Sequence, residues 1–535
     1  MKDSSKTVRV DIRPEGISVD AQVGQRFLDL LRERGLPVDS TCGGEGRCGA
    51  CCIRFSKAPP APDDADRALL APERLTEGWR LACRHAVEHE TIIERRVAAG
   101  LDQKAEDVRR SGRPQGDGSP HPLGVAVDIG TTTLAVYGYD LEARASLGAA
   151  AARNPQRGYG ADVISRIAHV RRSPEDGLRE LQHAVVRGIN ALVDDLVEGT
   201  DMTREGIRRA VVVGNPTMLH LLLGVDPRGI DVAPFRPKFS DGVRTTAAAI
   251  GLALAPETAV ATLPAVSAYV GADIVAGILD QGLHEARGAA LFRDVGTNGE
   301  IVLAQEGRLT ACSTAAGPAF EGASITDGMT ASAGAIEDVE IQGAGVRVTT
   351  IGDAPPIGLC GTGLLAAVAE LRAAGGINGQ GRLIDPGGGL ASRIHGGSKD
   401  ANFRLTDGTP PVRLSQADIR EFQLAKAAMR TGIEVLLSHC RVRATDLTHV
   451  LVGGAFSRRA HPAHLIETGL LPKVDPRRVE AVGNAAGRGA SAVLLEPGLL
   501  DRAAEIARGV EYLELSGDER FRSRFVDNIP FPASA

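Results

Sequence analysis

The stretch Ser40-Thr-Cys42-Gly-Gly-Glu-Gly-Arg-Cys48-Gly-Ala-Cys51 carries three cysteines on one glycine-rich loop, and a fourth cysteine, Cys83, follows further along the chain. Glycines let such a loop turn tightly and point backbone N–H groups at sulfur atoms, and a distant cysteine can complete the coordination shell. The spacing C-x5-C-x2-C is one residue longer than the plant-type spacing of [2Fe–2S] proteins. It predicts a [2Fe–2S] cluster held by Cys42, Cys48, Cys51 and Cys83.

Two other uses of these cysteines are less favoured. Zinc sites usually take their ligands as two close pairs, which this spacing does not offer. A disulfide framework is disfavoured because the chain shows no signal peptide and has eight cysteines in 535 residues, which predicts a reducing cytoplasmic location. Cys52 follows Cys51 on a predicted strand and should point to the opposite face, so it is left out of the ligand set.

The residues around the cysteine loop predict a β-grasp ferredoxin domain. Thr7–Ile12 alternates like a strand, Phe27–Gly35 is a short helical pattern closed by glycine, and Cys51–Phe55 is a second strand directly after the loop. This domain is expected to span residues 1–98. Residues 99–121 are rich in charge, Pro, Gly and Ser, so they predict a flexible linker.

Composition limits the rest of the chain. A length of 535 residues exceeds one ferredoxin and favours three or four domains. The net charge of −6 disfavours nucleic acid as a partner, and no stretch is apolar for long enough to cross a membrane. Proteins and small molecules are the expected partners, and a homodimer is the commonest oligomer for such a chain.

Two hairpins of one design predict a nucleotide site. In each, an apolar strand ends in an aspartate, a glycine turn follows, and hydroxyl or amide residues lead into a second strand. Glycine lets backbone N–H groups approach phosphates, and the carboxylate can hold Mg²⁺ through water. The candidate residues are Asp128, Gly130, Thr131 and Thr132 in the first hairpin, Asp294, Gly296, Thr297 and Asn298 in the second, and Gly453 and Gly454 after a third strand.

Ordered in this way, the chain resembles the superfamily of acetate and sugar kinases, heat-shock chaperones and actin. The resemblance implies a two-lobed, RNase H-like ATPase core, with lobes expected at residues 122–270 and 271–535, that binds ATP and Mg²⁺. Two small-residue stretches, near 271–279 and 483–493, look like its connecting helices. In several members an acidic residue at the start of the first such helix orients the attacking water. Asp273 matches that place, although aspartate is also a common helix N-cap.

The whole arrangement is similar to the reductive activators of corrinoid proteins. Four further motifs occur in order, at Arg153–Gln156, Val213–Met218, Gly317–Gly322 and Gly358–Gly363. The resemblance implies ATP-dependent return of a Co(II) corrinoid protein, or a corrinoid-dependent methyltransferase, to Co(I) with electrons from a reductase or ferredoxin. Arg293 departs from the apolar pattern expected of a buried strand, and either a phosphate or a partner is its candidate contact.

Two other functions remain open at this point. An ATP-driven activator of a radical dehydratase uses the same core, but typically holds one four-iron cluster between two subunits through few cysteines. A redox-sensing module, in which the cluster controls nucleotide occupancy and passes no electron on, belongs to a different class.

Overall fold

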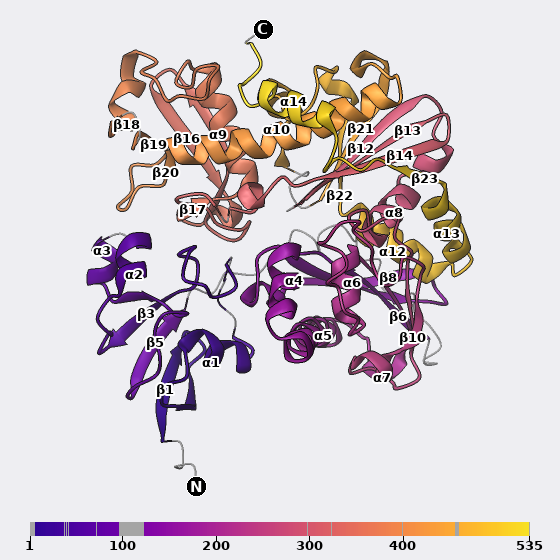
Figure 1. The fold of residues 1–535 in the computed structure, drawn as a ribbon, viewed down its shortest axis with the longest axis horizontal. Coiled ribbons are helices and arrows are strands. Elements are labelled where there is room, and N and C mark those ends of the chain that lie inside the picture. The colour runs from indigo at the N-terminus through magenta and orange to yellow at the C-terminus, as the bar shows by residue number, and fades with distance from the viewer. Residues whose placement is uncertain are drawn as a thin grey trace.

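The protein is an α/β chain with a small N-terminal domain and two larger lobes (Figure 1). The computed structural model describes residues 6–36, 38, 40, 42–70, 72–95, 122–296, 298–322, 324–397, 400–454 and 459–533. The predicted linker, residues 99–121, lies outside the described residues. Within the described part, no helix is both long enough and apolar enough to cross a lipid bilayer.

The N-terminal domain is a five-stranded sheet with helix α1 and two shorter helices, which confirms the predicted β-grasp fold. The strand order is β2-β1-β5-β3-β4, and β1 pairs with β5 in parallel while the other pairs are antiparallel. Helix α1 (Phe27–Glu33) buries its apolar side chains, and Gly35 follows it with a φ of 69° that glycine adopts without strain. The other elements are β1 (Thr7–Arg13), β2 (Ile17–Gln22), β3 (Cys52–Lys57), β4 (Trp79–Leu81), β5 (Thr91–Arg95), α2 (Asp64–Leu69) and α3 (Pro72–Thr76).

The main sheets of the two lobes share one arrangement of five strands and differ in the sixth, because β10 lies beside β11 in the first and β23 lies beside β14 in the second. In the first lobe the order is β10-β11-β9-β6-β7-β8, and in the second it is β22-β21-β12-β13-β14-β23. Each has an antiparallel meander of three strands, with two parallel strands added beside the first strand of the meander. This duplicated arrangement confirms the two related lobes that the paired hairpins predict and the RNase H-like core that the superfamily resemblance implies.

The two predicted hairpins are formed by corresponding strands, β6 and β7 in the first lobe and β12 and β13 in the second. First-lobe strands are β6 (Leu123–Ile129), β7 (Thr133–Asp140), β8 (Ala145–Arg153), β9 (Ile207–Gly214), β10 (Arg244–Thr246) and β11 (Ala259–Thr262). Its helices are α4 (Val163–Arg172), α5 (Pro174–Gly199), α6 (Pro216–Leu222) and α7 (Ala247–Ile250). Second-lobe strands are β12 (Ala289–Val295), β13 (Gly299–Gln305), β14 (Arg308–Thr314), β21 (Leu447–Gly453), β22 (Val479–Gly483) and β23 (Val510–Tyr512).

Helices α8 (Ala272–Asp280) and α12 (Ala485–Leu495) lie between the two main sheets (Figure 1). They pack so closely that a Cβ at Gly489 would lie 2.1 Å from the Ala276 carbonyl oxygen. Only glycine permits that approach, which explains the small residues of both stretches. An ion pair between Arg488 and Asp280, at 2.7 Å, joins the same helices. The first turn of each helix contributes residues to the pocket between the lobes.

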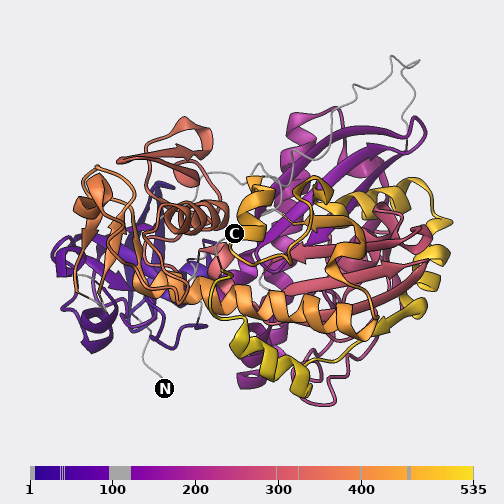
Figure 2. The same ribbon diagram turned by 90° about the horizontal axis from the view of Figure 1, so that it is seen from above.

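The second lobe also carries two small sheets. One is formed by β15 (Ala335–Gln342), β16 (Gly345–Thr350) and β17 (Gly358–Leu359), and the other by β18 (Ile394–His395), β19 (Asn402–Arg404) and β20 (Arg413–Ser415). Helix α10 (Gln416–His439) runs from these sheets along the main sheet of the lobe (Figure 2). The remaining helices are α9 (Gly361–Ala373), α11 (Pro462–Glu467), α13 (Leu499–Gly509) and α14 (Glu519–Asp527).

Candidate functional site

The four predicted cluster cysteines lie together in the N-terminal domain. The thiols of Cys42 and Cys48 contact each other, and so do those of Cys51 and Cys83. Cys42 and Cys48 are partly exposed, whereas Cys51 and Cys83 are buried beneath the loop. The Cys52 thiol instead donates to the Gly49 carbonyl oxygen at 2.8 Å.

The backbone around these sulfurs fits a bound cluster. Burial acts to raise the pKa of Cys42, but hydrogen bonds from the Arg47 amide, the Cys48 thiol and nearby loop amides lower it to about 7. The pKa of Cys83 is also lowered, first by its hydrogen bond with Cys51 and further by the Gly46 amide. N–H groups aimed at sulfur stabilise thiolates, which are the form that binds iron. The pKa values of the other two thiols are raised, that of Cys48 by burial and that of Cys51 by the Cys83 thiol and by burial. Backbone amides nevertheless donate to all four sulfurs, so the donor set suits a four-thiolate site.

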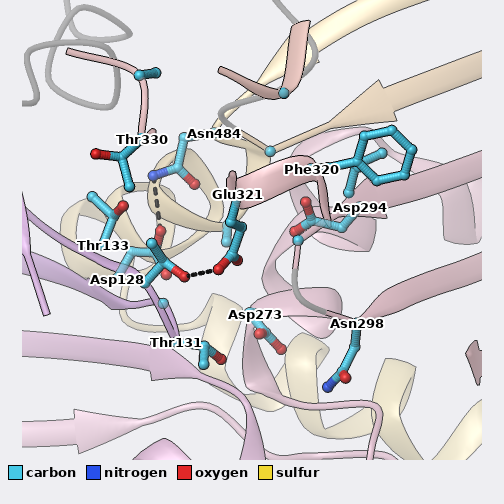
Figure 3. A pocket seen from close by; sticks show the side chains of 18 of the residues that line it. Asp128, Thr131, Thr133, Asp273, Asp294, Asn298, Phe320, Glu321, Thr330 and Asn484 are labelled. Carbon is cyan, nitrogen blue, oxygen red and sulfur yellow. Dashed lines mark hydrogen bonds between the residues drawn. The ribbon is translucent and has the colours of Figure 1, made fainter. Parts of the chain in front are cut away.

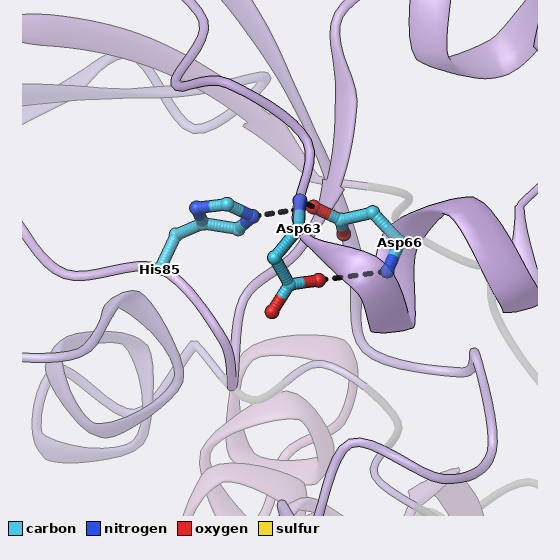
Figure 4. A group of neighbouring side chains, drawn as sticks. All are labelled: Asp63, Asp66 and His85. Atoms are coloured by element: carbon cyan, nitrogen blue, oxygen red, sulfur yellow. Dashed lines mark hydrogen bonds and ion pairs between the residues drawn. The ribbon is translucent and has the colours of Figure 1, made fainter.

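Near Cys83, Asp63, Asp66 and His85 form a polar trio in which Asp66 and His85 are buried and Asp63 is partly exposed (Figure 4). The carboxylate oxygens and the imidazole nitrogen of these residues lie within 4.8 Å of one another, close enough to bind a metal ion together. They instead form hydrogen bonds within the domain. Asp66 accepts from His85 at 2.6 Å and from the Leu81 amide at 2.9 Å, and Asp63 accepts from the Asp66 amide at 2.8 Å. The trio thus ties α2 to the residues on either side of Cys83.

The second site is a pocket between the lobes, lined by both hairpins and by the starts of α8 and α12 (Figure 3). The sequence-predicted residues that line it are Asp128, Gly130, Thr131, Thr132, Asp273, Asp294, Gly296, Asn298 and Gly454. Gly453, the last residue of β21, is not among the lining residues. It packs against the Phe292 ring, and a Cβ at Gly453 would lie 3.1 Å from that ring. Thr297 lies outside the described residues.

Gly454 needs to be glycine. Its φ is 85°, and a Cβ there would lie 2.6 Å from the Asp294 carboxylate and 2.7 Å from the Val295 carbonyl oxygen. A side chain would therefore displace the acidic group of the second hairpin.

The carboxylate of the first hairpin is held by the opposite lobe. Asp128 is 3% exposed and accepts a hydrogen bond from the Asn484 side chain at 2.9 Å. The same amide group donates to the Tyr137 hydroxyl at 2.7 Å, while the Asn484 side-chain oxygen caps α12 by accepting from the Gly487 amide at 3.0 Å. Asn484 thus both positions Asp128 and caps the start of helix α12.

Asp273 lies in the first turn of α8, but it is not the N-cap, which is Gly271. Its carboxylate accepts from the Ile274 amide at 2.9 Å and lines the pocket. Burial, together with the charges of Asp294 and Asp128, raises the pKa of Asp273 to about 7. A carboxyl group poised near neutrality at this place suits the handling of a proton or a water molecule.

Sequence reasoning missed several pocket residues. Glu300 stands directly opposite Asp294 in the β12–β13 pairing, and burial, followed by the charges of Asp273 and Asp294, holds its pKa well above the usual range. The pairing of the two strands could have predicted that Glu300 lies in the pocket, because residues that pair across a hairpin share a face of the sheet. Asn215, Glu321 and Asn484 belong to motifs noted in the sequence, but nothing local assigns them to the pocket.

Arg293 reaches neither a phosphate nor a partner surface, which corrects both expectations. Its side chain is fully buried, donating to the Leu470 carbonyl oxygen at 3.3 Å and contacting the Met429 sulfur on α10. Successive side chains on a strand point to opposite faces, so Arg293 faces α10 while Asp294 faces the pocket. Burial lowers the pKa of Arg293 to about 9.

Three protein-family models match the chain in succession. They are the 2Fe-2S iron-sulfur cluster binding domain over residues 10–88, the RACo middle region over residues 123–286, and the C-terminal domain of RACo, the ASKHA domain, over residues 288–535. The chain thus combines an iron–sulfur domain with an ASKHA-type ATPase domain.

Similar proteins point the same way. The "Corrinoid activation enzyme RamQ" of Eubacterium limosum is 33% identical over 423 residues, covering 76% of this chain and 70% of that protein. The "[Co(II) methylated amine-specific corrinoid protein] reductase" of Methanosarcina barkeri is 24% identical over 441 residues, covering 76% and 77%. A solved structure titled "Reductive activator for corrinoid,iron-sulfur protein" superimposes with a TM-score of 0.72 at 29% identity over 98% of both chains. The chain therefore belongs to the RACo family of reductive activators of corrinoid proteins.

Proposed function

We propose that this protein uses ATP to return an inactive Co(II) corrinoid protein to Co(I) by one-electron transfer from its N-terminal domain. The observation that carries the proposal is the joining, in one chain, of a four-thiolate loop and a two-lobed nucleotide pocket. The names of the relatives supply the client class: a corrinoid protein or corrinoid-dependent methyltransferase. A reductase or ferredoxin is the proposed electron donor.

The chain's own residues prepare the electron-transfer site. Cys42, Cys48, Cys51 and Cys83 would hold the cluster, and the loop amides would stabilise negative charge on the sulfurs. When bound, a [2Fe–2S] cluster supplies a one-electron relay, with a potential near about −400 mV in plant-type proteins. Placement of two of the cysteines at the partly exposed edge of the loop keeps the transfer distance to a partner short.

The pocket residues divide the work of binding ATP. Asp128 and Asp294 would hold Mg²⁺ from opposite lobes, and the amides and hydroxyls of the two hairpin turns would bind phosphates. Asp273 would hold the proton or position the water for hydrolysis. Because the ligands come from both lobes, phosphate binding favours closure of the pocket.

Lobe closure is the step that links ATP to an uphill electron transfer. Each 59 mV of unfavourable one-electron potential costs about 1.4 kcal/mol. Moving a two-state equilibrium from 1:99 to 99:1 takes about 5.5 kcal/mol of differential binding. An unfavourable potential difference of a few multiples of 59 mV is thus within the range that nucleotide binding can overcome.

The test is anaerobic mixing of the cluster-loaded protein with a Co(II) corrinoid protein and a reductant too weak to reduce the cobalt directly. The Co(II) to Co(I) absorbance change should require ATP, and it should vanish in Cys48→Ser and in Asp128→Ala. Cys52→Ser is the matched control and should retain activity. ATP binding without any corrinoid reduction would favour the redox-sensing module, and one four-iron cluster per two chains would favour the dehydratase activator.

A further inference from the structure

The N-terminal domain contacts the first lobe through a short segment, residues 154–159, which we call the bridge segment, and through an ion pair at 2.8 Å between Glu45 of the cysteine loop and Arg172 on α4. Arg32, on α1, is 8% exposed, and its Nε donates to the Gly158 carbonyl oxygen at 2.7 Å. A second guanidinium nitrogen donates to the same oxygen, and the guanidinium carbon lies 4.8 Å from the centre of the Tyr159 ring. The carbonyl ends a 3-10 turn, where an arginine is a favourable cap.

The cysteine loop contacts the same segment. The Ser40 amide donates to the Arg157 carbonyl oxygen at 3.3 Å. A Cβ at Gly43 would lie 3.0 Å from the Tyr159 carbonyl oxygen, so the loop backbone lies directly against the first lobe. Arg32 also donates to the Gly43 carbonyl oxygen at 3.3 Å. One arginine thus joins the loop beside Cys42 to the bridge segment.

The other side of the bridge segment reaches the nucleotide pocket. The Arg157 side chain is 6% exposed, and its Nη1 lies 3.3 Å from the Thr132 hydroxyl and 3.5 Å from the Glu321 carboxylate. The Thr132 hydroxyl donates to Glu321 at 2.5 Å. Figure 3 shows the Glu321 carboxylate within the pocket, near Asp128. In addition, the Asn154 side chain donates to the Gly130 carbonyl oxygen at 2.8 Å.

These contacts conflict with a bound polyphosphate. Thr132 belongs to the turn that would donate to phosphate oxygens, and in this structure its hydroxyl is given to Glu321. A phosphate at the turn would also meet the Glu321 carboxylate, and like charges at short range repel. The guanidinium of Arg157, released from Glu321, would turn toward the phosphate. Any such movement shifts the adjacent Gly158, which is the acceptor for Arg32.

We propose that docking of the N-terminal domain and binding of a nucleoside triphosphate oppose each other through the bridge segment. The phosphates displace Glu321 from Thr132 and Arg157, the contact between Gly158 and Arg32 loosens, and the cysteine loop leaves the first lobe. This inference rests on the proposed function for its meaning, since release would expose the loop to a client when ATP is bound. The linkage itself requires no client, and it is reciprocal: undocking must tighten nucleotide binding by the same factor.

The test measures binding of AMP-PNP, a non-hydrolysable ATP analogue, to the cluster-loaded full-length protein by calorimetry. Arg32→Ala should tighten binding about fivefold or more, which is the lower range of such couplings. Arg34→Ala is the matched control, because Arg34 follows the same helix, is exposed, and donates to the Asp20 carbonyl oxygen at 3.1 Å away from the lobe. It should bind AMP-PNP like the wild type. An Arg32→Ala affinity equal to that of the control, or weaker, would overturn the proposal.

Two further variants keep the proposal testable if Arg32→Ala loses its cluster and check the route of the coupling. If Arg32→Ala fails to retain its cluster, Tyr159→Leu removes the ring that Arg32 contacts on the first-lobe side, which weakens docking, and should tighten AMP-PNP binding in the same direction. In Glu321→Gln, which removes the opposing charge, adding Arg32→Ala should change the affinity by less than about twofold. A full fivefold effect in that background would place the coupling elsewhere and refute the route.

Hydrogen exchange supplies the reciprocal readout. In the wild type, AMP-PNP should speed amide exchange in residues 42–48 and 156–159, because both sides of the contact become exposed. Unchanged or slower exchange would contradict release. Neither experiment uses a corrinoid protein, so a failure of corrinoid reduction with this linkage intact would count against the proposed function alone.

Discussion

Replacing Asn484 with alanine is the sharpest test of how the two lobes share the nucleotide pocket. The change removes the hydrogen bonds to Asp128, at 2.9 Å, and to Tyr137, at 2.7 Å, together with the N-cap of α12. A hydrogen bond to a charged group contributes about 1.5–3 kcal/mol, a neutral one about 0.5–1.5 kcal/mol, and a cap about 1 kcal/mol. We therefore expect Asn484→Ala to destabilise the ATPase core by about 3–5 kcal/mol.

The function should suffer with the stability. Asn484 orients a candidate Mg²⁺ carboxylate without itself being a ligand, and loss of such a residue typically weakens metal affinity about 10–100-fold. The Mg²⁺ dependence of ATP hydrolysis should shift upward by that factor at a temperature where the variant is folded. Asn484→Ser keeps a side chain able to cap the helix and should recover about 1 kcal/mol of stability without restoring the Mg²⁺ dependence.

Urea unfolding followed by far-UV circular dichroism is the suitable stability assay. The chain has one tryptophan, Trp79, which lies in the N-terminal domain, so fluorescence would not report on the lobes. Thr246→Ala is the matched control, because Thr246 caps α7 at an exposed place away from the pocket by accepting from the Ala249 amide at 3.4 Å. The reasoning is refuted if Asn484→Ala loses no more stability than Thr246→Ala and keeps a normal Mg²⁺ dependence.

Three other predictions follow from the two sites. Cys48→Ser should bleach the visible spectrum of the cluster and lower the iron content, whereas Cys52→Ser should leave both unchanged; zinc without sulfide in the wild type would remove the redox role. Asp294→Ala should abolish Mg²⁺-dependent ATP hydrolysis while the cluster spectrum stays intact, and normal turnover would disprove the two-lobe site. The folded protein holds a proton on Asp273 up to a pKa of about 7, whereas the unfolded chain releases it near pH 4. Stability of the nucleotide-free protein should thus fall as pH rises through this window, by up to about 1.4 kcal/mol per pH unit, and a slope unchanged in Asp273→Asn by urea unfolding would contradict the assignment.

Local patterns in the sequence were sufficient to predict both chemistries. The spacing from Cys42 to Cys51 is set by how far a short loop can reach, so the cluster site can be predicted without a structure. The two Asp–Gly hairpins are equally local, because strand, turn and strand are neighbours in sequence. Their repetition predicted two lobes, and the shared strand order of the sheets confirms it.

Only the tertiary structure decided which distant residues complete the sites. Asn484 meets Asp128 across the lobes, and Glu321 meets Thr132 across the pocket, through contacts that no periodicity or spacing encodes. Arg293 looked available in the sequence, yet the pleat of β12 turns it into the core beneath α10. Hydrophobic pattern and turn chemistry act over a few residues, whereas such pairs depend on how whole sheets and helices pack. For the same reason, the contact of the cysteine loop with the bridge segment became visible only when the domains were seen together.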